Sequence, residues 1–336
     1  MENLTGLGRT ILAVDQDKMR LDQTVKNILA YKPLLARILK EVVIECKDLS
    51  CDEIEACIEG DVLVSRVYVD SGLTNAGERI DGLNTEAYFN GEGLDKYDLR
   101  TYLRLPEKRS AECIKLLVNI EAQNDDKPGY DIPLRALFYC CRMISAQQGV
   151  EFTTDKDDSV KYGNIKKVYS IWICTETAQK RANSIEKYEI KRDFLVGTNT
   201  DDPRYDILSA IIINISGKHD TDGMDNKLIC MLTDLFDERL DGVEKVEKLK
   251  NAYGLKLTKE VEGEVSDMCT YAKAMENKGI EKGIEKGIEK GIEKGLKALV
   301  YSLKEYVKDF ESLYAAVIKN EEYKDVSKEA VMKYYK

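Results

Sequence analysis

An α/β fold is predicted by two hydrophobic patterns that alternate along the chain. Residues 166–175 and 207–216 are near-continuous runs of β-branched and aromatic residues, the pattern of strands buried on both faces of a sheet. Residues 22–43 carry apolar side chains at helical spacing, and a second amphipathic helix pattern begins at Leu134. Because helix and strand patterns alternate up to about Gly217, we expect a mixed sheet flanked by helices, followed by a helical C-terminal region.

Shorter signals predict the other elements of this sheet domain. Pro33 interrupts the first helical pattern, so residues 22–43 form one kinked helix or two helices. The segments LPEKRSAEC and NDDKPGYDIP have the prolines and charges of connecting loops. Further strand patterns are found at residues 62–69, 97–104 and 115–123.

The chain after Gly217 carries helical patterns. DNKLICMLTDLFDERL and VEKVEKLKNAYG predict the helices of a small acidic region. A four-residue repeat, KGIEKGIEKGIEKGIEKGL, comes next, and amphipathic spacing returns from Leu299. The predicted organisation is a sheet domain at 1–217, a helical region at 218–277, the repeat at 278–296 and a C-terminal helical segment at 297–336.

The repeat is compatible with more than one role. Glycine costs about 1 kcal/mol per residue in a helix relative to alanine, so the segment is a poor autonomous helix. Its isoleucines recur every four residues, and because a helix has about 3.6 residues per turn, the apolar stripe drifts around the axis. We interpret the repeat as a linker or an oligomerisation helix, with a solvated, repeat-expanded spacer as the alternative. The isoleucines are Ile280, Ile284, Ile288 and Ile292.

Composition limits the classes of protein that this chain can represent. Its 336 residues carry a formal net charge of -10, which gives no global attraction to phosphate backbones, so any contact with DNA must use local basic patches. Nine cysteines without CxxC spacing and a single histidine argue against a structural zinc site. The sequence has neither a secretory signal pattern nor an apolar run of membrane-spanning length. We expect a reduced, cytoplasmic protein without a membrane partner.

Two acidic residues in neighbouring strand patterns form the main candidate site. If residues 97–104 and 115–123 pair as an antiparallel hairpin, the midpoint between Asp98 and Glu121 falls in the loop near Arg109, and the two acids lie opposite each other. Opposite residues have Cβ atoms about 4.5–5.5 Å apart, close enough for both carboxylates to bind one cation. Mg²⁺ suits such a site because it prefers oxygen ligands and commonly uses one or two carboxylates.

These residues resemble a known motif. Asp98, a hairpin, Glu121-Ala122-Gln123 and then a helix with Arg135 are similar in order to the D…(E/D)xK arrangement of PD-(D/E)XK nucleases. More narrowly, the chain resembles the nuclease family transposases related to recombination-promoting nucleases, over roughly residues 15–217. KGIEKG-like repeats are also frequent in that branch. The resembling segments are RIDGLNTE, YDLR, LLVNIEAQND and PLRALFYCCRMISAQQG.

The resemblance implies a fold, a cofactor and roles for several residues. It implies a restriction-endonuclease-like sheet and a DNA endonuclease, connected with recombination or a mobile element, that hydrolyses phosphodiester bonds. Asp98 and Glu121 would bind Mg²⁺, or Mn²⁺ in its place, together with the Ala122 carbonyl. Glu41, on the first predicted helix, is the candidate for an assisting acidic ligand. Gln123 stands where most of the superfamily has lysine, and an amide can orient groups only through hydrogen bonds.

A helix face next to the acids is the candidate DNA-binding surface. Arg135, Tyr139 and Arg142 follow Pro133 at i, i+4 and i+7 of a helix and share one face, which could hold phosphates that flank the cut. The alternative is that both arginines are solvated or pair with local acids. Further basic residues occur at Lys166, Lys167, Lys180, Arg181, Lys187, Lys191 and Arg192.

Three functional hypotheses follow. The first is a Mg²⁺-dependent DNA endonuclease. The second is a catalytically inactive DNA-binding or assembly protein, in which Gln123 marks the loss of cleavage. The third is an interaction protein that forms homo-oligomers through the repeat and the C-terminal helix.

Overall fold

The computed structural model describes residues 6–59, 63–64, 86–89, 93–96, 98–106, 113–125, 128–148, 151, 162–201, 205–216 and 224–335. The chain divides into two compact units, Met1–Ala272 and Lys273–Lys336. Within the described ranges, no helix is both long and apolar enough to cross a membrane.

A six-stranded mixed sheet forms the centre of the first unit, with the strand order β1-β4-β5-β6-β8-β7. β5, β6 and β8 are parallel to one another, whereas β1, β4 and β7 pair antiparallel with their neighbours. The strands are β1 (Leu63–Val64), β4 (Leu99–Pro106), β5 (Cys113–Asp125), β6 (Val168–Glu176), β7 (Ser184–Glu189) and β8 (Leu208–Asn214). The predicted mixed α/β sheet is therefore confirmed.

Four of the predicted strands correspond to β4, β5, β6 and β8, with shifted ends. β8 is buried along its whole length and β6 up to its last residue, as expected of strands covered on both faces. β1 falls within the strand predicted at 62–69, and the rest of that segment lies outside the described residues. Two features were not predicted: β7, and a separate antiparallel pair of β2 (Glu86–Phe89) and β3 (Gly93–Lys96). The sequence of β7, SIEKYE, lacks a clear apolar strand pattern. β7 is an edge strand, and an edge strand tolerates charged side chains.

The break predicted at Pro33 separates two helices, α1 (Gly6–Ala30) and α2 (Lys32–Val42). Tyr31 between them is extended, and Pro33 occupies the first turn of α2, where a missing N–H breaks no helical hydrogen bond. A short helix, α3 (Cys51–Cys57), begins at a Ser50–Glu53 capping box. Single 3-10 turns occur at Ile44–Cys46, Tyr162–Asn164 and Glu321–Tyr323.

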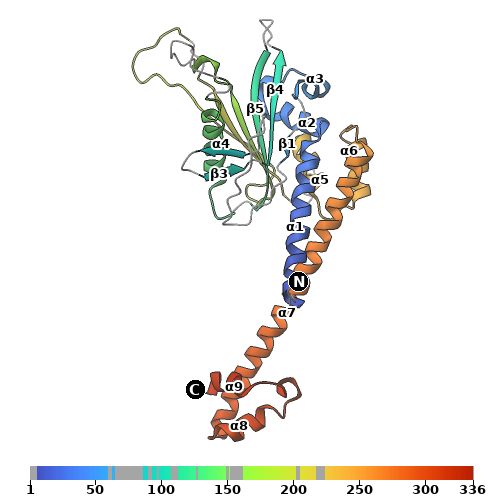
Figure 1. Cartoon of the computed structure of the whole chain (residues 1–336), viewed down its shortest axis with the longest axis vertical. Coiled ribbons are helices and arrows are strands. Elements are labelled where there is room, and N and C mark those ends of the chain that lie inside the picture. The colour runs from blue at the N-terminus through green and yellow to red at the C-terminus, as the bar shows by residue number, and fades with distance from the viewer. Residues whose placement is uncertain are drawn as a thin grey trace. The chain divides into compact units, whose positions relative to one another are not determined.

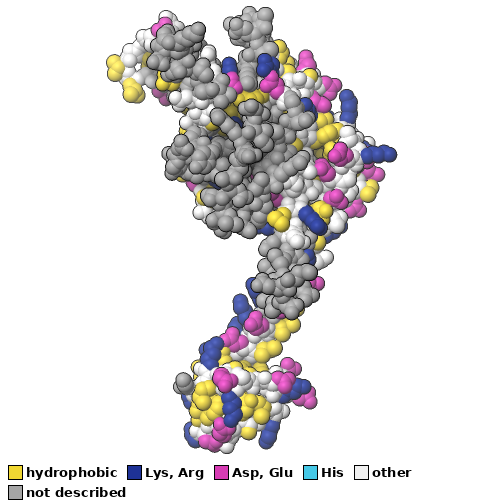
Figure 2. Space-filling view, in the orientation of Figure 1, with side chains coloured by type: hydrophobic (Ala, Val, Ile, Leu, Met, Phe, Trp, Pro, Cys, Tyr) yellow, Lys and Arg dark blue, Asp and Glu magenta, His cyan; other side chains and the backbone are white. Residues whose placement is uncertain are grey.

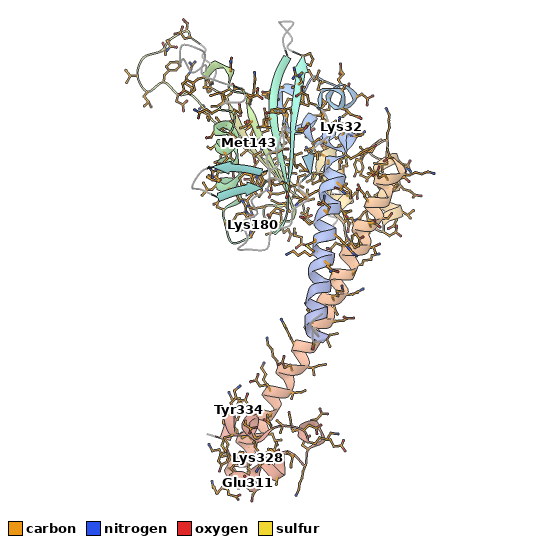
Figure 3. The ribbon with its side chains drawn as sticks, viewed as in Figure 1. Lys32, Met143, Lys180, Glu311, Lys328 and Tyr334 are labelled. Carbon is orange, nitrogen blue, oxygen red and sulfur yellow. The ribbon has the colours of Figure 1, made fainter. Side chains whose placement is uncertain are left out.

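Helices cover both faces of the sheet. α4 (Ile132–Ser145) lies against one face, and α1, α2 and α5 (Lys227–Phe236) lie on the other (Figure 1). On the α4 side, the core contains Trp172 and Met143, the latter labelled in Figure 3. The larger core, on the opposite face, joins α1, α2 and α5 to alternate residues of β4, β5, β6 and β8.

The chain from residue 224 to Ala272 belongs to the same compact unit as the sheet. Leu232 of α5 is 0% exposed, and Leu249 of α6 (Gly242–Asn251) is also buried, and both belong to the larger core. This core also includes Val265 and Met268, from the first part of α7 (Lys259–Tyr306). Residues 224–272 thus complete the hydrophobic core of the sheet domain.

The repeat lies within α7, which is helical over 48 residues. Its four isoleucines are 44–58% exposed, and Figure 2 shows hydrophobic side chains beside Lys, Arg, Asp and Glu along this helix. A Cβ added to Gly295 would meet the Tyr323 hydroxyl, whereas one added to Gly279, Gly283, Gly287 or Gly291 would meet nothing within 4 Å. Among the glycines of the repeat, Gly295 is therefore the one that lies against another side chain, that of Tyr323.

The C-terminal unit has a small core of its own. Val300 of α7, Leu313 of α8 (Phe310–Val317) and Val331 of α9 (Lys328–Tyr335) are each fully buried in it. The continuous amphipathic helix predicted from Leu299 is divided here, because the Asp309 side chain accepts the Ser312 N–H and starts α8 anew.

Leu232→Ala tests whether α5 contributes to the stability of the sheet domain. We expect this change to lower the free energy of unfolding by about 2–5 kcal/mol, because it leaves a cavity in the core. The measurement is urea denaturation followed by circular dichroism. Ile284→Ala, at a side chain that is 58% exposed, is the control and should change the stability by at most about 0.5 kcal/mol. An equally small effect of both changes would contradict the assignment of α5 to the core.

Candidate active site

The register between β4 and β5 places the two predicted acids together. Leu99 pairs with Ile120. The next step of this antiparallel register sets Asp98 opposite Glu121, so the predicted hairpin alignment is confirmed. The Asp98 N–H donates to Glu121 Oε1 at 3.1 Å, and the Ala122 N–H donates to Asp98 Oδ2 at 3.1 Å. Each carboxylate is therefore held by the backbone of the other segment.

The acid pair lies towards the carboxyl ends of the parallel strands. Glu121 is in register with Trp172 of β6, and both strands end within a few residues. In open α/β sheets, ligands bind outside the carboxyl ends of the strands. Glu121 is 7% exposed and the Asp98 side chain 20% exposed, so the pair is largely shielded from water. Lys180, labelled in Figure 3, is exposed in the turn that follows β6, at this same edge of the sheet.

A lysine that the sequence patterns do not single out meets the pair from α1. Lys26 Nζ lies 2.9 Å from Asp98 Oδ1 and 2.7 Å from Asp22 Oδ2. The residue is only 8% exposed. Its signal in the sequence is weak: Lys26 follows Asp22 by one helical turn and interrupts the apolar residues between Val25 and Leu29.

Gln123 and the start of α4 border the pair on the other face of the sheet. The Asp131 side chain caps α4 by accepting the Leu134 N–H. The Tyr130 hydroxyl just before it donates to Gln123 Oε1 at 3.1 Å. The Arg135 guanidinium lies 4.4 Å from the centre of the Tyr130 ring, which is a cation–π contact. Tyr130 is thus a further site residue, and it comes from a segment that the sequence indicates only as a turn.

Burial and charge act in opposite directions on the groups of the site. Burial raises the pKa of Asp98 above its ordinary value, although the Lys26 ammonium opposes this shift. Burial lowers the pKa of Lys26, but its two carboxylate partners raise it more, so the ammonium stays charged at neutral pH. Burial also lowers the pKa of Arg135, while Tyr139 and Glu121 contribute to a net upward shift. Lys26 and Arg135 therefore both stay positively charged beside Asp98 and Glu121, and they come from helices on opposite faces of the sheet.

Asp98 and Glu121 bring together two carboxylates, the ligand type that Mg²⁺ prefers. Mg²⁺ commonly uses one or two protein carboxylates, with water and substrate phosphate as the other ligands. In this structure the Lys26 ammonium pairs with Asp98 at 2.9 Å. Over the ranges given above, no cluster of three or more His, Cys, Asp or Glu residues could hold a metal ion. The described residues thus offer a two-carboxylate site.

Glu41, the predicted assisting ligand, lies elsewhere. It is exposed near the end of α2, and its Oε1 accepts a hydrogen bond from Asn226 Nδ2 at 3.1 Å. None of its contacts with described residues is with Asp98 or Glu121. In the structure, Glu41 links α2 to the start of α5. The prediction failed because helical spacing alone does not show which end of a helix faces the edge of the sheet that carries the acids.

The predicted DNA-binding face of α4 is largely buried. Arg135 donates to the Tyr139 hydroxyl at 2.9 Å, as their i, i+4 spacing predicts. However, Tyr139 is 3% exposed and its ring packs 5.6 Å from that of Trp172, while Arg142 is 9% exposed and lies over the Phe138 ring. Tyr139 therefore positions Arg135, and neither Tyr139 nor Arg142 forms an open surface for phosphate.

Lys167 is likewise not part of a basic surface. It is 7% exposed and pairs with Glu45 at 2.9 Å and with Asp206 at 3.0 Å. The Tyr169 hydroxyl donates to the other oxygen of Glu45 at 2.6 Å. This network lies at the opposite ends of the parallel strands from Glu121, where β6 and β8 begin.

Comparison with protein-family models, with curated proteins and with solved structures finds no match to this chain. The chemistry of the site is therefore inferred from its own residues and from the motif that they resemble.

Two substitutions of Glu121 separate its hydrogen bond from its charge. Glu121→Leu leaves the part-buried Asp98 N–H without this acceptor, and we expect it to cost about 1–3 kcal/mol of stability. Glu121→Gln keeps an acceptor oxygen of the same shape, so it should unfold close to wild type in urea denaturation. If both variants lose the same stability, the carboxylate charge and not the hydrogen bond supports the site.

Proposed function

We propose that this protein is a metal-dependent DNA endonuclease of the PD-(D/E)XK type, built on a restriction-endonuclease-like sheet. The observation that carries the proposal is the pairing of Asp98 with Glu121 at the carboxyl edge of the sheet. The order of elements supports it, because an antiparallel hairpin with the acids is followed by α4 and then by a strand parallel to β5. A connection with recombination or a mobile element rests on the motif resemblance alone.

Asp98 and Glu121 would hold Mg²⁺ together with the Ala122 carbonyl, and Mn²⁺ would serve in its place. Once bound, the ion would polarise a phosphate oxygen and acidify an attacking water. Arg135 provides a fixed positive charge beside the acids for a neighbouring phosphate. Gln123, held by Tyr130, orients groups by hydrogen bonding and adds no charge.

DNA would approach the carboxyl edge through local positive charge. The net charge of -10 repels a polyanion overall. Lys180 in the turn after β6 is exposed at this edge, and it replaces Tyr139 and Arg142 as the proposed phosphate contact. Phosphate contacts of this kind position a duplex without reading its sequence.

Cleavage of supercoiled plasmid DNA with Mg²⁺ tests the proposal. Wild-type protein should nick the plasmid, while Asp98→Asn and Glu121→Gln should abolish nicking, because each removes a metal ligand but keeps the size of the side chain. Gel electrophoresis measures the product. Glu41→Gln is the matched control, since Glu41 contacts α5 and not the acid pair, and it should cut at the wild-type rate.

Equal nicking by the wild type and both site variants would reject the endonuclease. Mg²⁺-independent DNA binding by a wild-type protein that never cuts would instead favour the alternative of a catalytically inactive DNA-binding protein.

A second candidate function is self-association through α7. The four isoleucines of the repeat are 44–58% exposed on a helix whose lysines and glutamates alternate, so a second copy offers it both apolar contact and opposite charges. This function is independent of the acid pair and could accompany cleavage.

Ile284→Glu combined with Ile288→Glu should reduce the mass of the full-length protein in multi-angle light scattering, because buried charges would oppose pairing of the stripe. Leu195→Glu is the control: this leucine is 96% exposed but lies far from the repeat in sequence. A wild-type protein that is monomeric, or a variant of unchanged mass, would leave the repeat as a spacer.

A further inference from the structure

The proposed nuclease site lacks a cation at the position where the motif usually has one. Gln123 is uncharged, and its amide oxygen accepts the Tyr130 hydroxyl. A phosphodiester that is attacked by water gains negative charge, and fixed donors aimed at this charge are a major source of rate acceleration. If the site cuts DNA, a residue other than Gln123 would supply this charge, in addition to Arg135 and the metal ion.

Lys26 is placed to do so. Its ammonium contacts Asp98 directly, at 2.9 Å, although it comes from α1 and lies far away in the sequence. Lysine is almost never fully buried unless it is paired, and Lys26 is 8% exposed. Asp22, the second partner, is 2.7 Å away and holds the side chain from the same helix.

Counted over the described residues, Lys26 has one N–H left for a ligand. An ammonium has three donors. Asp98 and Asp22 each take one, and no other residue in the described part of the chain takes the third. Among the described residues, a charged side chain with one N–H unused therefore adjoins the acid pair.

We propose that Lys26 replaces the missing motif lysine and donates its remaining N–H to the DNA phosphate bound at Asp98 and Glu121. The proposal rests on the proposed function and names a further catalytic residue for it. Lys26 acts as a permanent charge and transfers no proton. A purely structural role is the competing interpretation: there, Lys26 would only neutralise Asp98 until a metal ion takes its place.

The two roles differ in what the removal of Lys26 does to cleavage. In either role, Lys26 competes with a metal ion for Asp98, so a variant without the ammonium should bind the ion as tightly as wild type or more tightly. Only in the catalytic role does cleavage fall at the same time.

The experiment compares full-length wild type with Lys26→Met, Lys26→Arg and Lys18→Met. Lys18 is the matched control, an exposed lysine on the same helix. Cleavage of a fluorescent DNA duplex gives kcat and KM, calorimetric titration with Mn²⁺ gives metal affinity, and thermal melting checks the fold. We expect Lys26→Met to lower kcat by about 10²-fold or more with little change in KM. Its Mn²⁺ affinity should be undiminished, Lys26→Arg should restore part of kcat, and Lys18→Met should match wild type.

Three results would overturn the proposal. Cleavage by Lys26→Met at the wild-type rate, with Glu121→Gln inactive, would reject the role of Lys26 and leave the endonuclease intact. Loss of Mn²⁺ binding in a folded Lys26→Met variant would show that the ammonium is needed to hold the acid pair for the ion, so that any loss of cleavage would come from metal binding and not from a contact with the phosphate. A wild-type protein that neither binds Mn²⁺ nor cuts DNA would reject both the endonuclease and this role. Should Lys26→Met fail to fold, Lys26→Gln keeps a hydrogen-bond donor for Asp98 without charge, and the same loss of kcat is expected.

Discussion

The antiparallel register of β4 and β5 is the constraint on which the site depends. Side chains alternate between the two faces of a strand, so a slip of one residue would send Glu121 into the larger core and bring Ile120 out of it. Ile120 is 2% exposed in that core, and exposing it while burying a carboxylate would cost several kcal/mol. The same apolar residues that hold the sheet together therefore also align Asp98 with Glu121. No further interaction is needed to set the register of β4 and β5 at the site.

The site also depends on its position between two layers of helices. Lys26 reaches Asp98 from α1, on the side of the larger core, and Arg135 stands near Glu121 from α4 on the opposite face. Two buried carboxylates would repel each other without such cations. Because the two charges come from different layers, the packing of both helical layers on the sheet determines the electrostatics of a small region at its edge.

The sequence predicted the elements with strong periodicity and the pairing of Asp98 with Glu121, because the spacing of a hairpin fixes which residues are opposite. It did not predict β7, where charges at a sheet edge break the alternation, nor the inclusion of α5 in the core. The contact of Lys26 with Asp98 links residues that lie far apart in sequence, and no local pattern encodes such a distance. The burial of Tyr139 and Arg142 was not predicted either. Helical periodicity shows which residues share a face, but it does not show which part of the protein covers that face.

Among the glycines of the repeat in α7, only the last one contacts another part of the described chain. Gly295 lies against the Tyr323 hydroxyl, which would have to move to admit a side chain there, whereas the four preceding glycines face open space. Each additional unit would lengthen the helix by about 6 Å without touching a buried side chain of either core. The number of units is therefore nearly neutral for the folding of either core, so the length of this helix can change without altering the packing around Asp98.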